Sequence, residues 1–477
     1  MTLSEKHLRI FLAILVLLTT LTYYHRNPTG DDAWFAEQSY WFVKDGIIRS
    51  EFFRGLLGWE NQLLVSHKLF LLFGAGLINL FGYHLPVVQF VGLLSFGVII
   101  AEIIAYIRNK EGRYGSWSFL AILILIFSNR LLIKMSFENR PELMLAALGF
   151  GSFLCLNNKR PSLAGSLIAG VLAGLAMLCH LNGVIYLIAG FGTLVYLRLY
   201  KQALLFAVAG GLTALFYFTD IVLADNGFAI WSYQFRNDPA TQSAFGWYPK
   251  LIVILTFPKL FFESPEQIAL SLLLVFLLWH QRKYLRALPV VLKVYSSLLI
   301  VSFWLITKHG SGTYMPLFIP FMLVLVYELY RSNPFKNWGL AVVLAAYFGI
   351  GIYGTIEIIY KNFSSEFLPV SYKNLREKIP TNEKGLVPLT YFFNEYDRHP
   401  ALLSSENFKH HAIPTANPSA QLAQWAHQQG VGFILMDYAY RPEDFYPKPG
   451  TSSLPSYRLT YFDGRFAVYR HSGNTAH

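Results

Sequence analysis

The apolar stretch LRIFLAILVLLTTLTYY, Leu8–Tyr24, is followed closely by the polar stretch PTGDDAWFAEQ, Pro28–Gln38. An apolar run of this length approaches the roughly 20 helical residues that cross a hydrocarbon core. Lys6 and Arg9 lie at its start, as in a secretory signal, but no small-residue cleavage site follows it. We therefore expect a retained first membrane span, with three acids directly outside it: Asp31, Asp32 and Glu37.

Composition groups the whole chain with membrane proteins. Its 477 residues are 54% hydrophobic and 17% aromatic, and only 14% are charged, which is unusual for a soluble domain. The sequence predicts an α-helical polytopic membrane protein with about 11 to 13 spans. Five further windows are long and apolar enough to span: Val87–Ile107, Leu163–Leu178, Ala203–Val222, Leu288–Ile306 and Gly339–Ile359.

The formal net charge of +11 does not indicate nucleic acid, because the basic residues are scattered and many lie at the ends of apolar windows. If the short basic connectors face the cytoplasm, the positive-inside rule assigns the loop around Asp31 and the C-terminal segment to the outer face. These connectors are Tyr106–Gly115, Asn157–Pro161, Tyr196–Gln202, His280–Arg286 and Arg331–Asn337.

After about residue 360 the composition of the sequence changes, and polar residues, prolines and short alternating runs become frequent. GLVPLTYFF, GFILMDYAY and RFAVYRH are typical of strands, and PSAQLAQWAHQQG is typical of a helix that ends at Gly430. We expect a transmembrane domain over residues 1–360, with an outer loop at 25–67, and a small extracytoplasmic α/β domain over 361–477.

The adjacent acids Asp31 and Asp32 are the first candidates for chemistry. They precede a segment, Asp31–Lys44, whose aromatic residues have helical spacing and suit an interfacial helix. One acid at a helix start accepts hydrogen bonds from free backbone N–H groups and complements the helix dipole. Capping accounts for one acid, whereas the pair also suits a base and an orienting group.

A second group of charges occurs in SFENRPELML, Ser136–Leu145. Glu138, Arg140 and Glu142 lie there at the mouth of an apolar segment, where charges usually face a cavity and a partner. The alternative is a solvated helix start in which Glu138 and Glu142 bracket Arg140. Arg130 and Lys134 lie on the same outer side against the positive-inside trend, which indicates an anionic ligand or simple headgroup contact.

Two more motifs belong to this face. TKHGSGTYMPLFIPF, Thr307–Phe321, carries Lys308 and Tyr314 in a glycine-rich connector that suits phosphate binding, although glycine and proline are also ordinary in turns. MLCHLNG contains His180, which by itself is more often a satisfied bundle histidine than a ligand. All four groups fall on one membrane face, as expected for a site that meets a lipid-borne substrate.

The pattern resembles the GT-C glycosyltransferases, specifically the protein O-mannosyltransferases and aminoarabinose transferases that use polyprenyl-phosphate sugars. Members open with one span and an outer loop that begins Asp-Glu-x-x-aromatic-Ala, and DDAWFA, Asp31–Ala36, differs only by Asp for Glu. NRPEL matches an Arg-x-acid pattern, and KHGSGTYMPLFIP and CHLNG are similar to two later motifs. Where many members have Lys-Pro-Pro, this chain has SHKLF, with His67 and Lys68 but no prolines.

The resemblance implies a GT-C fold and a set of site residues. Asp31 and Asp32 are the expected catalytic acids. The residues expected to bind the donor phosphate are Arg140, Lys308, Tyr314, Arg130 and Lys134. The residues expected to orient the sugar, the acceptor or a metal are Glu142, Glu37, His67, Lys68 and His180. No cofactor is required, and the candidate metal is a divalent cation, Mg²⁺ or Mn²⁺, with Asp31 and Glu142 as ligands.

The function implied is transfer of a sugar from a polyprenyl-phosphate donor to a lipid-linked, glycan or protein acceptor, by inverting single displacement at the outer face of the bacterial inner membrane. Membrane lipids are the other expected partners. The main rival is a lipid or lipid-linked-sugar transporter or flippase, which would need charges at midplane depth and often repeated halves. A structural membrane subunit is the second rival, and it would leave Asp31 and Asp32 without a role.

Overall fold

The computed structural model describes residues 5–111, 117–158, 160–239, 242, 245–307, 312–332, 337–440 and 442–473. The chain divides into two compact units. The first comprises Met1–Arg26, Val65–Phe73 and Gln89–Ser364, and the second comprises Asn27–Leu64, Gly74–Val88 and Ser365–His477. The second unit therefore combines residues of the expected outer loop with those of the expected C-terminal domain.

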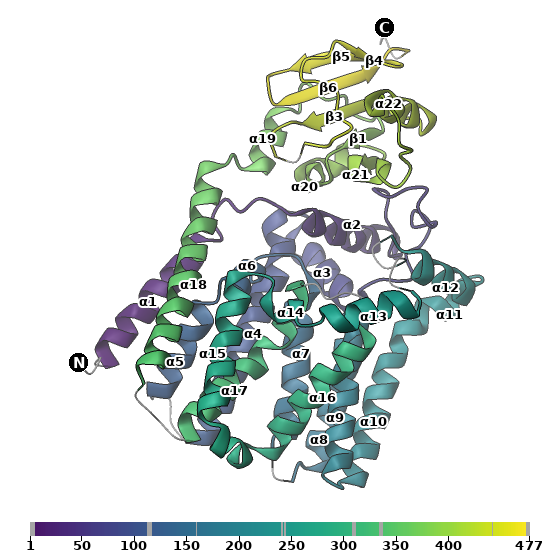
Figure 1. The fold of residues 1–477 in the computed structure, drawn as a ribbon. Helices are drawn as coiled ribbons and strands as arrows, with labels where there is room; N and C mark the ends of the chain where they lie inside the picture. Colours follow the sequence, from purple (N-terminus) through teal and green to yellow (C-terminus); the bar gives the residue numbers. More distant parts are fainter. Residues whose placement is uncertain are drawn as a thin grey trace. The chain divides into compact units, whose positions relative to one another are not determined.

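The first unit is helical (Figure 1). Two helices, α3 (Lys68–Phe81) and α4 (Leu85–Glu111), have residues in both units. The other helices of the first unit are α1 (Glu5–Leu21), α5 (Trp117–Phe127), α6 (Arg130–Met135), α7 (Pro141–Leu156), α8 (Leu163–Cys179), η1 (Leu181–Gly183), α9 (Val184–Tyr196), α10 (Tyr200–Leu215), η2 (Phe216–Phe218), α11 (Thr219–Leu223), α12 (Gly227–Asn237), α13 (Trp247–Thr256), α14 (Lys259–Phe262), α15 (Pro265–His280), η4 (Arg282–Ala287), α16 (Val290–Ile306), η5 (Gly312–Leu317), α17 (Ile319–Ser332) and α18 (Trp338–Ser364).

All five predicted apolar windows fall on helices: α4, α8, α10 with α11, α16 and α18. By length and composition, three stretches of the described chain are able to cross a membrane, starting at Leu85, Tyr200 and Trp338. The pair Trp247–Phe262 and Pro265–His280, bent by 90°, adds a fourth if it is one span, and six further apolar helices are shorter. The predicted total of about 11 to 13 spans stays a prediction.

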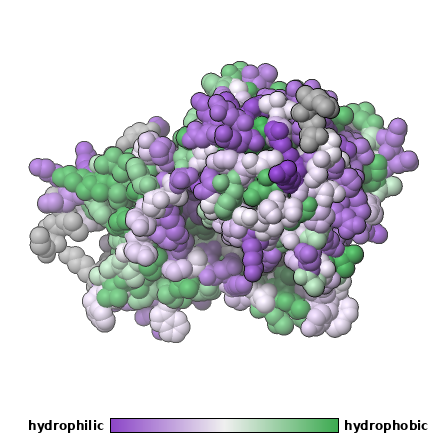
Figure 2. Space-filling model, turned by 90° about the horizontal axis from the view of Figure 1, so that it is seen from above, coloured by the Kyte–Doolittle hydropathy of each residue, from purple (hydrophilic) through white to green (hydrophobic). Residues whose placement is uncertain are grey.

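Many large apolar side chains of the first unit are exposed, which fits helices that face lipid. On α10 and α11, Leu204, Leu212 and Leu223 are 65%, 61% and 80% exposed. Exposed apolar surface on this scale is costly in water and favourable in a bilayer. Figure 2 shows one face of the molecule, on which hydrophobic patches lie among mostly hydrophilic side chains.

The second unit is built on a six-stranded mixed sheet in the order β2-β1-β3-β6-β5-β4 (Figure 1). β1 pairs in parallel with β2 and β3, whereas β3, β6, β5 and β4 pair antiparallel. In register, Leu386 lies beside Leu403 and Ile434, and Leu435 lies beside Val468. The strands are β1 (Gly385–Val387), β2 (Leu402–Ser404), β3 (Phe433–Asp437), β4 (Ser453–Leu454), β5 (Tyr457–Phe462) and β6 (Phe466–His471).

Seven helices of the described residues lie wholly in the second unit: α2 (Gly30–Asp45), α19 (Leu368–Asn374), η6 (Leu389–Tyr391), α20 (Phe392–Glu395), η7 (Tyr396–Arg398), α21 (Ser405–Phe408) and α22 (Pro418–Gln428). The predicted helix that ends at Gly430 is α22; Asn417 caps its start and Gly430 takes φ +68 after its last turn. Its buried face, with Leu422 and Trp425, packs in the core of the sheet. GLVPLTYFF is a strand only over its first three residues, because Pro388 cannot donate to a ladder and helical turns follow.

Candidate functional site

The helix predicted over Asp31–Lys44 is α2, and its first turn holds both candidate acids. Thr29 is the N-cap; its hydroxyl accepts from the backbone N–H of Asp32, and the Asp32 carboxylate accepts from the backbone N–H of Thr29 at 2.6 Å. This reciprocal capping box satisfies free backbone donors of the helix start. Asp32 is fully buried, whereas Asp31 is only partly buried. Of the two acids, Asp32 is the one that performs the capping expected from the sequence.

The start of α2 is anchored by its own unit. The side-chain oxygen of Asn27 accepts from the backbone N–H of Leu368 at 2.8 Å, and its amide group donates to the carbonyl of Glu366 at 2.8 Å. The Tyr440 hydroxyl donates to the carbonyl of Pro28 at 2.7 Å. The backbone that leads to Asp31 is therefore fixed on the α/β part of the second unit.

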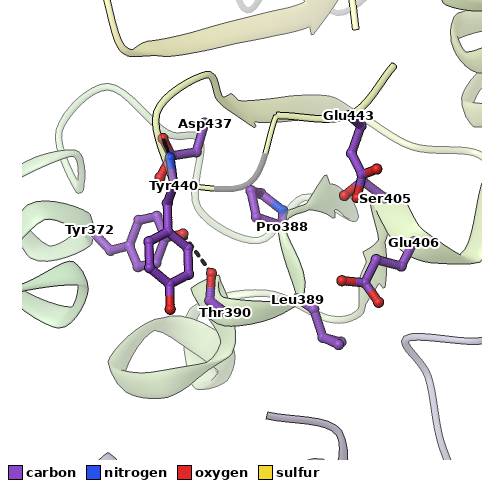
Figure 3. Close-up of a pocket in the computed structure, with 9 residues that line it drawn as sticks. All are labelled: Tyr372, Pro388, Leu389, Thr390, Ser405, Glu406, Asp437, Tyr440 and Glu443. Carbon is purple, nitrogen blue, oxygen red and sulfur yellow. Dashed lines mark hydrogen bonds between the residues drawn. The ribbon is translucent and has the colours of Figure 1, made fainter. Parts of the chain in front are cut away.

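Tyr440 also lines a small pocket that follows the carboxyl ends of β1, β2 and β3 (Figure 3). Ligands of open parallel sheets often bind at such ends. Here the polar groups are engaged with one another: the Tyr372 and Thr390 hydroxyls lie 2.8 Å apart, Asp437 pairs with Arg465, and Glu443 pairs with Lys409. These pairings fit a pocket that stabilises the unit. It is lined by Tyr372, Pro388, Leu389, Thr390, Ser405, Glu406, Asp437, Tyr440 and Glu443.

Glu37, a further predicted site residue, is fully buried on α2. One carboxylate oxygen accepts from the backbone N–H groups of Glu51 and Phe52 and from the indole of Trp41, and the other accepts from the Ser50 hydroxyl. Burial raises the pKa of Glu37 to about 7, against the lowering effect of these hydrogen bonds. Through these four hydrogen bonds, Glu37 fixes the loop after α2.

Arg140 and Glu142 open helix α7 in the first unit. Arg140 is the N-cap residue, Pro141 takes the first helical position, and Glu142 lies in the first turn, where a carboxylate complements the helix dipole. Arg140 binds Glu142 with two hydrogen bonds, from Nε at 3.2 Å and from Nη2 at 2.8 Å. Glu142 is 3% exposed, so this pair is not the solvated helix start that the spacing also allowed.

Glu138 does not bracket Arg140, because it pairs instead with Arg26 at 3.2 Å. Arg26 also donates to the backbone carbonyl of Lys134. A Cβ atom on Gly92 of α4 would lie 2.7 Å from the carbonyl oxygen of Glu138. Close approach of this loop to α4 therefore requires glycine at residue 92, and it positions the segment that leads to Arg140.

Three predicted residues gather around the Arg140–Glu142 pair in the same unit. The rings of His67 and His180 stack at 4.4 Å between centroids and 16° between planes, and the Tyr314 ring meets His180 edge-on at 5.9 Å. Burial lowers the pKa of His180 to about 4; the Arg140 charge acts in the same direction and Glu142 opposes it. Burial also holds the pKa of His67 well below its usual value, assisted by His180 and Arg140. Both histidines are therefore neutral at pH 7.

The structure does not bring Arg130, Lys134 and Lys68 into this group of contacts. Arg130 bridges Glu266 at 3.4 Å and Glu357 at 2.8 Å, which links α6 to α15 and α18. The Lys134 side chain is exposed. Lys68 is buried and bonds Asp220 and the carbonyl of Tyr217, with its ammonium over the Tyr217 ring. Lys308 lies outside the described residues.

Sequence reasoning missed three polar residues: Arg26, Asn182 and Asp220. Asn182 donates its backbone N–H to Nδ1 of His180 at 2.9 Å and lies beside Tyr314. The motif CHLNG contains Asn182, so its spacing from His180 was a usable signal. Arg26 and Asp220 find their partners far away in the sequence, at Glu138 and Lys68, and no local spacing indicates such pairs.

The predicted metal site would use the carboxylates of Asp31 and Glu142. Within the described part of the chain, no group of three or more His, Cys, Asp or Glu side chains is arranged to hold a metal ion. Each carboxylate oxygen of Glu142 accepts one hydrogen bond from Arg140, which takes up two of the roughly four lone-pair sites of the carboxylate. Asp31 and Glu142 belong to different units. The predicted cation site at Asp31 and Glu142 stays a prediction.

No protein-family model matches the sequence, and no curated protein sequence does. Several solved structures are similar to this chain in fold. ArnT from Cupriavidus metallidurans bound to undecaprenyl phosphate matches over 100% of both chains, with 16% identity and TM-score 0.61. Its apo form matches over 96% of this chain and 97% of that chain, with 14% identity and TM-score 0.55.

A third similar structure is the oligosaccharyltransferase from Archaeoglobus fulgidus in the apo form. It matches over 90% of this chain and 69% of that chain, with 13% identity and TM-score 0.52. At these identities the likeness is one of fold, and it extends over nearly the whole chain. Both proteins are GT-C glycosyltransferases. The chain therefore has the GT-C fold of these membrane glycosyltransferases.

Proposed function

We propose that this chain is a membrane glycosyltransferase that moves a sugar from a polyprenyl-phosphate donor to a lipid or cell-envelope acceptor at the outer face of the membrane. The observation that carries the proposal is the cluster of His67, Arg140, Glu142, His180 and Tyr314 in the helical unit of a GT-C fold. In a related fold, ArnT is bound to undecaprenyl phosphate. A polyprenyl phosphate is therefore the donor carrier proposed here.

Arg140 is the proposed phosphate-binding residue. Because His67 and His180 are neutral at pH 7, Arg140 supplies the positive charge of the described cluster. A guanidinium binds phosphate oxygens in a fixed, bidentate geometry and stays charged at every physiological pH. Lys308 is proposed as a second cation from the sequence motif alone. Glu142 holds Arg140 in place through its two hydrogen bonds.

The proposed reaction is a single displacement. The acceptor hydroxyl oxygen attacks the anomeric carbon, and the bond from that carbon to the phosphate oxygen breaks with its electron pair staying on the phosphate. The acceptor proton passes to the Asp31 carboxylate, and the phosphate leaves with one additional negative charge, which Arg140 stabilises. The anomeric centre is inverted. No step passes through a metal ion.

Asp31 is proposed as the base because Asp32 is engaged in the capping box. Asp32 then acts by holding the helix turn that carries Asp31, in place of the direct sugar contact that the resemblance implied.

The test is an assay of purified membranes from cells that produce the chain, supplied with a panel of polyprenyl-phosphate sugars and labelled in the sugar. We expect transfer of label to a lipid-linked, glycan or protein acceptor, and loss of that transfer in Asp31→Asn. Membranes without the chain provide the background. Transfer at normal rates by Asp31→Asn, or none by the wild-type protein with any donor, would contradict the proposal and favour a transporter of lipid-linked sugars.

A further inference from the structure

A hydrogen bond to His180 determines which of its two ring nitrogens carries the proton. Its Nδ1 lies 2.9 Å from the backbone nitrogen of Asn182. A backbone N–H group can only donate, so Nδ1 accepts and carries no proton. A neutral imidazole keeps one proton, which must then be on Nε2. His180 therefore presents a neutral N–H donor at Nε2.

The orientation of this donor is fixed from three sides. His180 is the N-cap of the short helix η1, and its backbone is extended at φ −158 and ψ 138. The His67 ring lies parallel to it and the Tyr314 ring meets it edge-on. An imidazole held by a hydrogen bond and two rings has little freedom to turn. A donor arranged in advance costs no reordering when a ligand binds.

Nε2 of His180 has no hydrogen-bond acceptor among the residues that the structure describes, and the ring is only partly buried. The charge of Arg140 acts on both histidines. The Arg140 charge lowers the pKa of His180 and the Glu142 charge raises it, so both charges lie within electrostatic range of this ring.

We propose that the Nε2–H group of His180 donates a hydrogen bond to a phosphate oxygen of the polyprenyl-phosphate sugar. The inference rests on the proposed function and adds a second donor to the phosphate site. When the bond from the anomeric carbon to the phosphate oxygen breaks, its electron pair remains on the phosphate. The acceptor of this hydrogen bond thus becomes more negative in the transition state, and the bond strengthens there. His180 acts mainly on kcat for this reason.

The competing explanation is that His180 only caps η1. Two substitutions distinguish capping of η1 from phosphate binding, because each retains the function of one ring nitrogen only. In His180→Asn the side-chain oxygen replaces Nδ1 as the cap, since asparagine is a good N-cap residue, but the distal donor is lost. In His180→Gln the amide nitrogen reaches the place of Nε2, and the cap is lost.

The first measurement is steady-state sugar transfer by purified protein, together with thermal unfolding. For His180→Asn we expect kcat to fall by about 10- to 100-fold, with a smaller rise in KM and little change in Tm. For His180→Gln, which keeps the distal donor, we expect a smaller fall in kcat than for His180→Asn, and a lower Tm. The inference is overturned if His180→Asn has normal kcat, or if the activities of the two variants simply follow their Tm values.

The second measurement is binding of undecaprenyl phosphate, with undecaprenol as the matched lipid that lacks the phosphate. We expect the wild-type protein to prefer the phosphate, and His180→Asn, but not His180→Gln, to lose part of that preference. Wild-type protein that binds the phosphate but transfers no sugar would contradict the proposed function and leave the phosphate contact supported. Equal preference in wild type and His180→Asn, or none in wild type, overturns the inference.

Discussion

The Asp32 carboxylate accepts hydrogen bonds from both the backbone N–H and the hydroxyl of Thr29, at 2.6 and 3.0 Å, at the first turn of α2. Its neighbour Asp31 is outside this box and is partly exposed. Two adjacent acids of identical chemistry thus have different surroundings. The capping geometry separates a residue that holds the helix from the residue proposed to take the acceptor's proton.

The first prediction concerns this pair. Asp31→Asn removes the proposed base and leaves the capping box intact, so we expect sugar transfer to fall by at least about 100-fold with an unchanged Tm, as for loss of a general base. Asp32→Ala removes the box and should lower stability by about 1 kcal/mol. Activity assays and thermal unfolding of both variants check this. Equal losses of stability in the two variants would contradict the division of roles.

The second prediction concerns the pH dependence that Glu37 creates. Its pKa is raised from 4.5 to about 7 in the folded protein, so the unfolded chain releases this proton at lower pH than the folded one. Stability therefore falls as pH rises from about 4.5 to about 7, by about 3 kcal/mol in total, and is constant above.

Glu37→Gln is the matched variant for this test. Its amide oxygen can keep the three N–H donors, and its amide nitrogen can donate to the Ser50 hydroxyl. We expect unfolding profiles of the two proteins to diverge between pH 4.5 and 7, with the glutamine variant the more stable at pH 8. Glu37→Ala, which loses all four hydrogen bonds, should be less stable at every pH. Parallel profiles for wild type and Glu37→Gln would refute the shift.

The third prediction uses the opposite signs of Arg140 and Glu142. Arg140→Ala removes the charge proposed to hold the phosphate, and binding of undecaprenyl phosphate should weaken by about tenfold or more. Glu142→Gln keeps the charge of Arg140 but loses part of its hydrogen-bonded positioning, so binding should weaken less than in Arg140→Ala. The matched control is Arg130→Ala, because Arg130 pairs with Glu266 and Glu357 and its loss should affect stability alone. Weakening by Glu142→Gln as large as that by Arg140→Ala would show that the pair acts only structurally.

The fourth prediction separates Lys68 from the phosphate site. Lys68 is buried against Asp220, which is 31% exposed in its side chain. Breaking such a pair from one side should cost about 1 to 3 kcal/mol after screening is allowed for. Lys68→Met should thus lower Tm with no change in undecaprenyl phosphate affinity. The double variant with Asp220→Asn should lose less stability than the two single losses together, and strict additivity would argue against the pairing.

The sequence by itself determined the local elements. Helical spacing and a capping signal predicted α2 almost to the residue, proline and glycine delimited α22, and five apolar windows became helices. Within the candidate site, the Arg140–Glu142 pair is two residues apart and was readable as a pair. Hydrogen bonds within a helix or turn link near neighbours, so short-range spacing carries this information.

Only the tertiary structure decided which elements share a core and which site residues meet. Tyr40 of α2 donates to Asp397, 357 residues away, and this pairing joins α2 to the C-terminal part of the same unit. The tertiary structure also decided that His67 stacks on His180. It likewise decided that Lys68, Glu37 and Arg130 bind other partners, outside the candidate site. Such pairings depend on how helices and strands pack, and packing is a property of surfaces far apart in the chain, which no local spacing records.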